Sequence, residues 1–131
     1  MISIEAARYC SLRTYRRDGR RVDTPVWFAQ QGGRYFVFSA GDAGKVKRLR
    51  NDSHAEVAPC DVRGRLLGDW YPARAELIAD PGEIAVALHA LRRKYGVWMW
   101  LTDLLARISG RYDKRAYIAF RLEATAGGEE S

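Results

Sequence analysis

Turns divide the first forty residues into short segments rich in strand-forming side chains. The segments span residues 6–15, 22–29 and 35–39. An Asp-Gly pair at positions 18–19 suits a tight hairpin, and a second glycine-containing turn is predicted at residues 31–33. Pro25 has no backbone N–H, so it marks an edge position, a strand start or a bulge. The first third of the chain is therefore predicted to be a three-stranded antiparallel meander.

The remaining chain mixes helices with further strands. A short helix is predicted over residues 45–50, with Asp42 as its N-cap and with Val46 and Leu49 facing the sheet. A longer helix follows Asp80, and residues 98–108 form another apolar helical stretch. Further strands are expected at residues 55–62, 70–78 and 116–123. Because about six strands do not alternate with helices as βαβ units, the sequence predicts a mainly β antiparallel barrel with short flanking helices.

Length and composition limit the classes of protein to which the chain can belong. The chain of 131 residues fits one domain, expected over residues 1–123, with a loose C-terminal tail at 124–131. No apolar run has the length of a membrane span and the N-terminus does not resemble a signal peptide, so cytoplasmic residence without a membrane partner is expected. The net charge of +6 fits either an anionic partner or simple solubility.

Several kinds of site are not expected. Cys10 and Cys60 do not have metal-ligand spacing, and with only two histidines besides them no metal site is predicted. Both cysteines are expected to be free thiols, and Cys60 a structural strand residue, because no activating base is evident. No nucleic-acid-binding motif is present, and no triad or acid pair appears, so no catalytic residue is assigned.

One segment suggests anion binding. Ser39 ends a strand, a small-residue loop follows, and the next helix begins with Lys45, Lys47 and Arg48. Cations at a helix N-terminus oppose the helix dipole, and a bound phosphate reverses this cost because it meets free amides and ammonium groups together. The same charges also fit an ordinary solvated face, and the charge pattern leaves both interpretations open.

The chain resembles a known family in several short segments. They are residues 14–19, 24–28, 44–49, 58–64 and 92–96. In order and spacing these segments are similar to the pyridoxamine 5'-phosphate oxidase-like split-barrel proteins, in particular the subgroup that uses the deazaflavin coenzyme F420. The resemblance implies a six-stranded antiparallel split β-barrel that forms a homodimer, with two cofactor sites at the subunit interface.

The resemblance also implies roles for particular residues. Lys45, Lys47 and Arg48 would bind the cofactor phosphate, and Ser39 would lie at the edge of the ring. Trp70 would reach across from the partner subunit. The segment expected to line the cofactor ring consists of Thr24, Pro25, Val26 and Trp27.

The function implied is that of an oxidoreductase. A bound F420, or FMN as second choice, would carry a hydride to or from a small organic substrate, while the protein supplies binding and orientation. The alternative is a barrel that binds a flavin or haem without turnover, because a fold alone does not decide function. A homodimer is also expected because Trp27, Trp70, Trp98 and Trp100 present more aromatic surface than one small core readily hides.

Overall fold

The computed structural model describes residues 3–41 and 43–123. Three helices are present in this part of the chain, α1 (Gly44–Asn51), α2 (Pro81–Tyr95) and α3 (Val97–Ile108), with short 3-10 turns at Ile4–Ala6 and Tyr112–Lys114. The strands are β1 (Tyr9–Tyr15), β2 (Arg21–Val26), β3 (Ala29–Gln31), β4 (Arg34–Ala40), β5 (His54–Cys60), β6 (Tyr71–Ile78) and β7 (Arg115–Leu122). The predicted tail, 124–131, lies outside the described residues.

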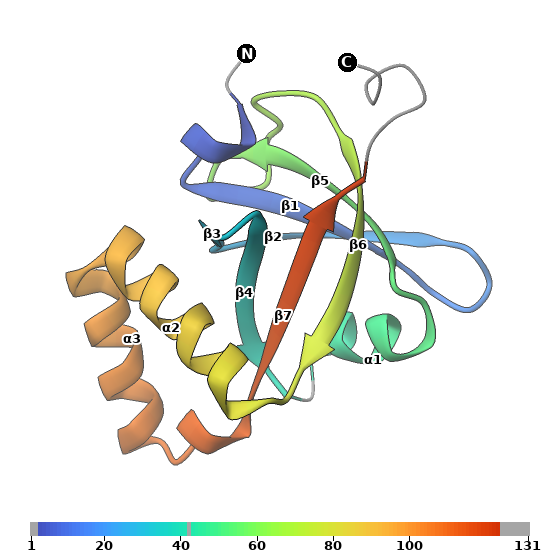
Figure 1. Cartoon of the computed structure of the whole chain (residues 1–131). Coiled ribbons are helices and arrows are strands. Elements are labelled where there is room, and N and C mark those ends of the chain that lie inside the picture. Colours follow the sequence, from blue (N-terminus) through green and yellow to red (C-terminus); the bar gives the residue numbers. More distant parts are fainter. Residues whose placement is uncertain (1–2, 42, 124–131) are drawn as a thin grey trace.

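All the strand pairs are antiparallel, and the sheet has the order β2-β1-β5-β6-β7-β4-β3. Its two edge strands, β2 and β3, are separated by only Trp27 and Phe28 in the chain. The sheet must therefore curl until its edges approach each other, which produces the half-barrel in Figure 1. This architecture confirms the predicted mainly β split-barrel fold.

The inside of the curled sheet holds the larger core. Alternate residues of each strand point inward, as the pleat requires, and Leu12, Val57 and Ile118 are fully buried there. Helix α1 lies beneath one end of the barrel (Figure 1) and contributes Leu49 to this core. Val46 and Leu49 are both buried, which confirms the face predicted for this helix.

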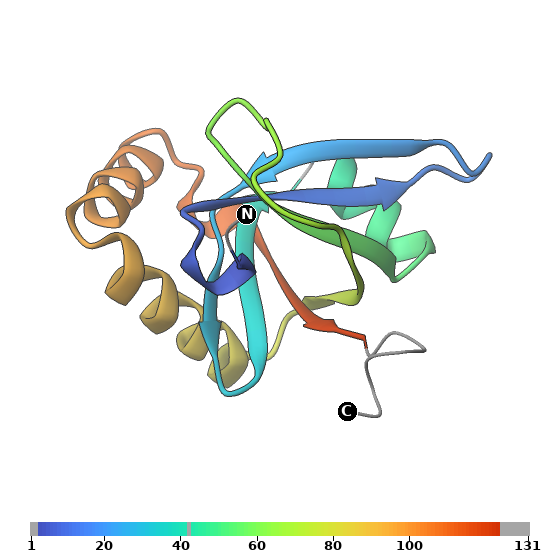
Figure 2. The same ribbon diagram turned by 90° about the horizontal axis from the view of Figure 1, so that it is seen from above.

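A second core lies outside the barrel, under α2 and α3. Figure 2 shows both helices on one side of the sheet, with α2 nearer to the strands. Phe36, Tyr117 and Ala119 project from β4 and β7 into this layer, where they meet Leu91 and Met99. The middle of strand β7 is therefore buried on both faces, which explains why its residues there are apolar on both sides of the strand.

The predicted strand 22–29 is in fact two strands, so the sheet has seven strands where six were predicted. The chain leaves β2 after Val26 and enters β3 at Ala29. Between them, the Phe28 N–H donates to the Tyr95 hydroxyl at 2.9 Å, and that hydroxyl lies 2.9 Å from the Phe28 carbonyl oxygen. Because the Tyr95 hydroxyl accepts from the Phe28 N–H, this donor needs no strand partner, and the ladder is interrupted.

Local turn and cap predictions hold elsewhere. Gly19 has a positive φ of 88° in the β1–β2 turn, and Pro25 lies in an edge strand. The Asp80 side chain caps α2 by accepting from the Glu83 N–H. The cap position of α1 is Ala43, and Asp42, predicted for that role, lies outside the described residues. Within residues 3–41 and 43–123, no helix is long and apolar enough to span a membrane.

Candidate functional site

A surface cavity of about 320 Å³ lies where the end of β2, the end of β4, the first turn of α1 and the middle of α3 meet. Its lining residues are Pro25, Val26, Trp27, Phe38, Ser39, Lys45 and Thr102. Antiparallel pairing positions these groups, because β7 holds β4 in register with Ser39 opposite Ala116. The structure thus brings together five residues that the sequence analysis assigned to one site: Pro25, Val26, Trp27, Ser39 and Lys45.

Trp27 forms an ordered aromatic wall of this cavity. Its ring stacks on Tyr95 with centroids 4.5 Å apart and planes 9° apart, and Phe38 meets it edge-on at 6.2 Å. Tyr95 is itself held, since its hydroxyl contacts the Phe28 backbone and lies 2.7 Å from the Arg8 carbonyl oxygen. The indole is therefore fixed in orientation before any ligand arrives, which lowers the entropic cost of stacking a flat ring there.

Lys45 brings positive charge to the cavity. It lies in the first turn of α1, which contains no acidic residue. Burial lowers the pKa of Lys45, and the nearby Arg48 guanidinium lowers it further. Among the described residues, no ion pair involves Lys45 or Arg48. A half-buried ammonium in this setting is a natural partner for an anion.

The glycines of the 40–44 loop have packing reasons of their own. A Cβ atom on Gly41 would collide with the Lys114 carbonyl oxygen, to which the Gly41 N–H also donates at 2.9 Å. A Cβ on Gly44 would approach the Arg48 guanidinium to 2.7 Å. Gly41 is therefore explained by close approach to the protein backbone, whereas the flexible Arg48 side chain could move away from a Cβ at position 44, and the evidence for an anion site rests on Lys45.

The other four predicted binding residues do not line the cavity. Thr24 is half-buried in β2 opposite Leu12, and Lys47 is exposed on α1. Arg48 points back to the barrel, where its Nε donates to Thr14 Oγ1 at 2.6 Å. The Trp70 ring lies beneath the Arg13 guanidinium, 3.8 Å from its carbon.

Sequence reasoning did not include Phe38, Thr102 and Tyr95 in the site. Phe38 was assigned only to a strand, and Thr102 lies in a helix whose sequence is mostly apolar. Tyr95 belongs to the 92–96 segment that carried part of the family resemblance, and this was the one signal that marked it. Its role as the support of Trp27 depends on a contact between residues far apart in the chain, and its hydroxyl bonds to Phe28, 67 positions away.

Both cysteines are free and buried. Burial raises the pKa of the Cys60 thiol to about 11, with a further contribution from Asp61, and burial also raises the pKa of Cys10. Thiols that stay protonated at neutral pH are poor nucleophiles. This agrees with a structural role for Cys60. Within the described residues, no cluster of three potential metal ligands is found.

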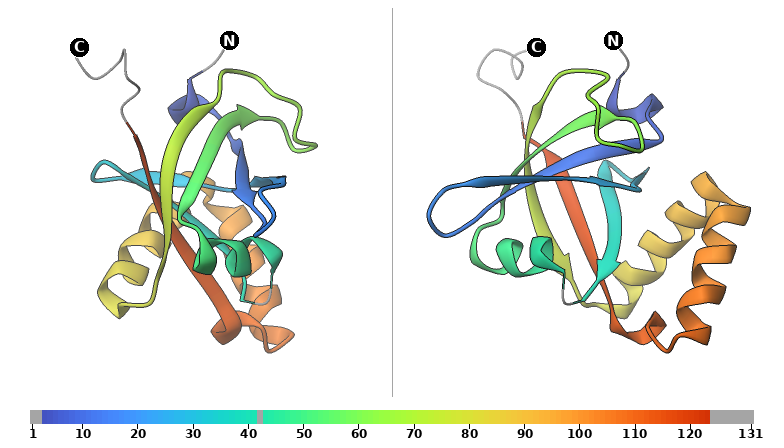
Figure 3. Two further views of the ribbon diagram at one scale, coloured as in Figure 1. Left: turned by 90° about the vertical axis from the view of Figure 1, so that its right-hand side faces the viewer. Right: turned by 180° about the vertical axis from the view of Figure 1, so that it is seen from behind.

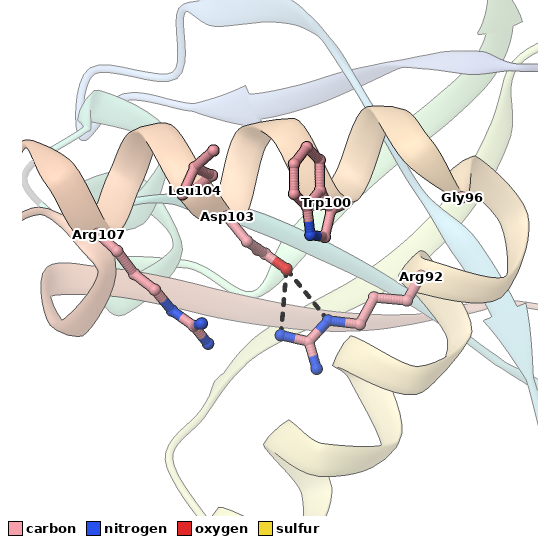
Figure 4. Close-up of a pocket in the computed structure, with 6 residues that line it drawn as sticks. All are labelled: Arg92, Gly96, Trp100, Asp103, Leu104 and Arg107. Carbon is pink, nitrogen blue, oxygen red and sulfur yellow. Dashed lines mark hydrogen bonds and ion pairs between the residues drawn. The ribbon is translucent and has the colours of Figure 1, made fainter.

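A second cavity, of about 390 Å³, lies at the corner between α2 and α3 (Figure 4). The Asp103 carboxylate at its floor accepts from Arg92 Nε at 3.1 Å and from Arg115 Nη1 at 2.8 Å. Arg107 and Trp100 flank the opening. Because Asp103 is already paired with two arginines, this polar cluster is explained as the contact that fastens α3 to α2 and β7.

Comparison with known proteins identifies the fold. No protein-family model and no curated protein sequence matches the chain. Three solved structures each match 92% of the chain. HutZ, the haem storage protein of Vibrio cholerae, matches with a TM-score of 0.68 and 14% identity over 84% of its own length. A protein assigned as a pyridoxamine 5'-phosphate oxidase from Listeria innocua has a TM-score of 0.60 and 14% identity over 87% of its length, and an F420 reductase has a TM-score of 0.59 and 16% identity over 90% of its length. At such low identity, the likeness establishes a shared split-barrel fold.

Proposed function

We propose that this protein is an oxidoreductase that binds F420, or FMN as second choice, in the cavity between β2, β4, α1 and α3. The observation that carries the proposal is the convergence of an ordered indole, a strand-end hydroxyl and a half-buried ammonium in one cavity. This combination suits a phosphorylated cofactor with a flat ring. The presence of an F420 reductase and a haem storage protein among the structural neighbours supports a ring-shaped ligand for this fold.

Each residue has a defined task in this proposal. Lys45 and the amides at the start of α1 hold the phosphate, and Lys47 and Arg48 add positive potential. Trp27 and Pro25 provide a wall for the ring, and the Ser39 hydroxyl lies at its edge. The bound cofactor would supply hydride transfer to or from an organic substrate in the cytoplasm. The protein residues bind and orient it and keep water from one of its faces.

The size and position of the cavity support a homodimer as part of this proposal. Its volume is near the lower limit of ligand pockets, so one chain covers only part of a ring system. Pro25 in the cavity wall lies near Gly64 of the 61–70 loop, since a Cβ added at Gly64 would reach it, and this loop exposes Val62, Leu66 and Leu67. We place the partner subunit on this apolar loop, from which it would cover the open side of the cavity.

Sedimentation at micromolar concentration is expected to give twice the 14.9 kDa mass of the chain. Charged substitutions at the loop, Val62→Asp with Leu66→Asp, should yield a folded monomer because they place charges in an apolar contact. Val86→Asp, at an exposed site on α2, is the matched control and should leave the dimer intact. A wild-type protein that stays monomeric with its fold intact contradicts the dimer.

The rival function is binding without turnover, including haem binding. Haem iron needs an axial ligand, most often histidine. In the described residues, His54 lies beside Tyr15 and His89 is exposed on α2, and neither lines the cavity. The cavity of a single chain therefore favours a flavin-type ring.

Titration of the purified protein with F420, FMN and haemin tests the proposal. Saturable fluorescence changes are expected for F420 and FMN, with F420 bound more tightly, and no shift of the haemin absorption band is expected. Oxidation of the bound reduced cofactor by added organic acceptors then separates an enzyme from a binding protein. The proposal fails if neither flavin-type cofactor binds, or if haemin alone saturates the protein.

A further inference from the structure

A third cavity, of about 440 Å³, lies where the C-terminal half of α2 meets β3 and the 3-10 turn at Ile4–Ala6. The right panel of Figure 3 shows the dark blue 3-10 turn and the cyan β3 at the same end of the molecule as the end of α2. None of the residues lining this α2–β3 cavity also lines the candidate cofactor cavity. Its lining consists of Glu5, Phe28, Ala29, Gln30, Gln31, Ala90, Arg93 and Lys94.

The amine of Lys94 is held against the protein at the wall of this cavity. Its Nζ donates to the Ala7 carbonyl oxygen at 2.9 Å. It also lies 3.5 Å from the centroid of the Phe28 ring and 5.3 Å from that of Tyr95, so the rings replace part of its water shell. Within residues 3–41 and 43–123, no carboxylate forms an ion pair with it. Ammonium groups usually remain hydrated or pair with an acid, and Lys94 does neither fully.

The groups around Lys94 leave part of its amine uncharged near neutral pH. Burial lowers the pKa of Lys94 to about 8, and the Arg8 guanidinium lowers it further. The Cys10 thiolate would oppose this, but burial raises the pKa of that thiol and keeps it protonated. Arg93 adds positive charge from α2, and Glu5 is the acidic residue in the lining. About a tenth of the amine is then uncharged at pH 7, and an uncharged amine is nucleophilic.

The rest of the lining suits a small organic anion. The exposed Arg93 guanidinium forms no ion pair in the described part of the chain, and a guanidinium can bind a carboxylate through two parallel hydrogen bonds. The Glu5 carboxylate is held by the Tyr35 hydroxyl, which donates to it at 3.0 Å. An apolar wall is formed by the buried side chains of Phe28, Ala29 and Ala90.

We propose that the α2–β3 cavity binds a small 2-oxo acid, whose carbonyl carbon forms a reversible imine with the Lys94 amine. The uncharged amine adds to the carbonyl carbon, and a C–N bond forms while one proton moves from the nitrogen to the carbonyl oxygen. The C–O bond of this adduct then breaks, and its hydroxyl group leaves as water together with the second proton of the nitrogen. One amine and one carbonyl thus give one imine and one water, with no oxidation or reduction.

The other residues of the cavity have separate tasks in this reaction. Arg93 would bind the carboxylate of the 2-oxo acid, and Glu5 would exchange protons with the adduct. The apolar wall would accommodate a small apolar chain. Imine formation at Lys94 does not depend on a flavin-type cofactor, because the residues proposed to hold that cofactor line a different cavity.

Reductive trapping tests the reaction. The purified full chain is incubated with pyruvate and cyanoborohydride, which converts an imine into a stable secondary amine, and peptide mass spectrometry identifies the modified lysines. Label at Lys94 is expected to exceed that at Lys47, an exposed lysine of α1, by about tenfold or more. It should also rise between about pH 6 and about pH 8 as the Lys94 amine loses its proton. Equal label at Lys94 and Lys47 would overturn the proposal.

Acetone and Arg93→Gln test the selection of an acid. Acetone has a ketone but no carboxylate, so its label should favour Lys94 over Lys47 less strongly than that of pyruvate. Arg93→Gln should reduce pyruvate label at Lys94 by about tenfold and leave acetone label nearly unchanged, because it removes the carboxylate contact. Arg111→Gln is the matched control: Arg111 is exposed beyond the C-terminal end of α3, at the other end of the helix pair from Lys94. Equal preference for Lys94 with both ketones, or unchanged pyruvate label in Arg93→Gln, would contradict a site for 2-oxo acids.

Lys94→Arg separates a reactive amine from a lysine that only fastens α2 to the N-terminal segment. Arginine retains a cation that can donate to the Ala7 carbonyl oxygen, but it stays protonated and forms no imine. The variant should be folded by circular dichroism and should lose the fast-reacting part of the label. Lys94→Gln provides a second variant without an amine. A rate of total labelling that is unchanged in both variants would show that Lys94 is a structural residue.

Discussion

Lys45→Ala is expected to weaken binding of F420 or FMN by about tenfold to a hundredfold. A charge-assisted hydrogen bond contributes about 1.5–3 kcal/mol, and each 1.4 kcal/mol corresponds to about tenfold in affinity. The folded protein should be unaffected or slightly more stable, because the change removes a half-buried cation next to Arg48 at a helix start. Fluorescence titration measures the affinity, and urea unfolding measures the stability.

Dependence on pH provides a second measurement of the same group. Burial and Arg48 lower the pKa of Lys45, so its ammonium loses its proton at a lower pH than an ordinary lysine. Phosphate binding needs the charged form. Affinity in the wild-type protein should therefore fall as the pH rises through this lowered pKa, and Lys45→Ala should lose that dependence.

Arg121→Ala is the matched control for charge. Arg121 is exposed near the end of β7, whereas Ser39 pairs close to the start of that strand, so Arg121 lies at the opposite end from the cavity. Its removal lowers the net charge by the same amount and should leave affinity unchanged. Equal binding by both variants would show that α1 carries an ordinary solvated basic face.

Asp103→Ala is expected to lower the free energy of unfolding by about 3–5 kcal/mol, since it breaks a buried ion pair by removing one partner. The Asp103 side chain is 9% exposed and that of Arg115 only 5%. Arg115 Nη2 already has no hydrogen-bond partner among the described residues. Without the carboxylate, Arg115 would be left as an uncompensated buried charge. Urea unfolding followed by circular dichroism measures the effect.

Two comparisons isolate this mechanism. Asp113→Ala, at an exposed position, should change the free energy of unfolding by less than about 0.5 kcal/mol. Asp103→Ala combined with Arg115→Met should recover much of the loss, because the double variant contains no buried charge. A loss below about 1 kcal/mol in the single variant would mean that water reaches Arg115 and that α3 is held by apolar packing alone.

The cavity shows how far a family resemblance extends. The family resemblance assigned Pro25, Val26, Trp27, Ser39 and Lys45 to one site, and these residues do lie around one cavity. Trp70, assigned across a subunit interface, lies on Arg13 in the single chain, so its role remains a prediction about the dimer. Thr102 enters from α3, and its position depends on how that helix docks rather than on any local motif.

The sequence by itself determined the elements that depend on neighbouring residues. Turns at Gly19, the Asp80 cap and the inward faces of Val46 and Leu49 follow from local backbone preference and periodicity, which act over a few residues. Only the tertiary structure decided the break after Val26, because its cause is the Tyr95 hydroxyl from far along the chain. The same holds for the cavity wall, which forms where the curled sheet meets the helices, and for the exposed side of α3. Contacts between residues far apart in the chain decide both features, and such contacts have no signature in a local sequence pattern.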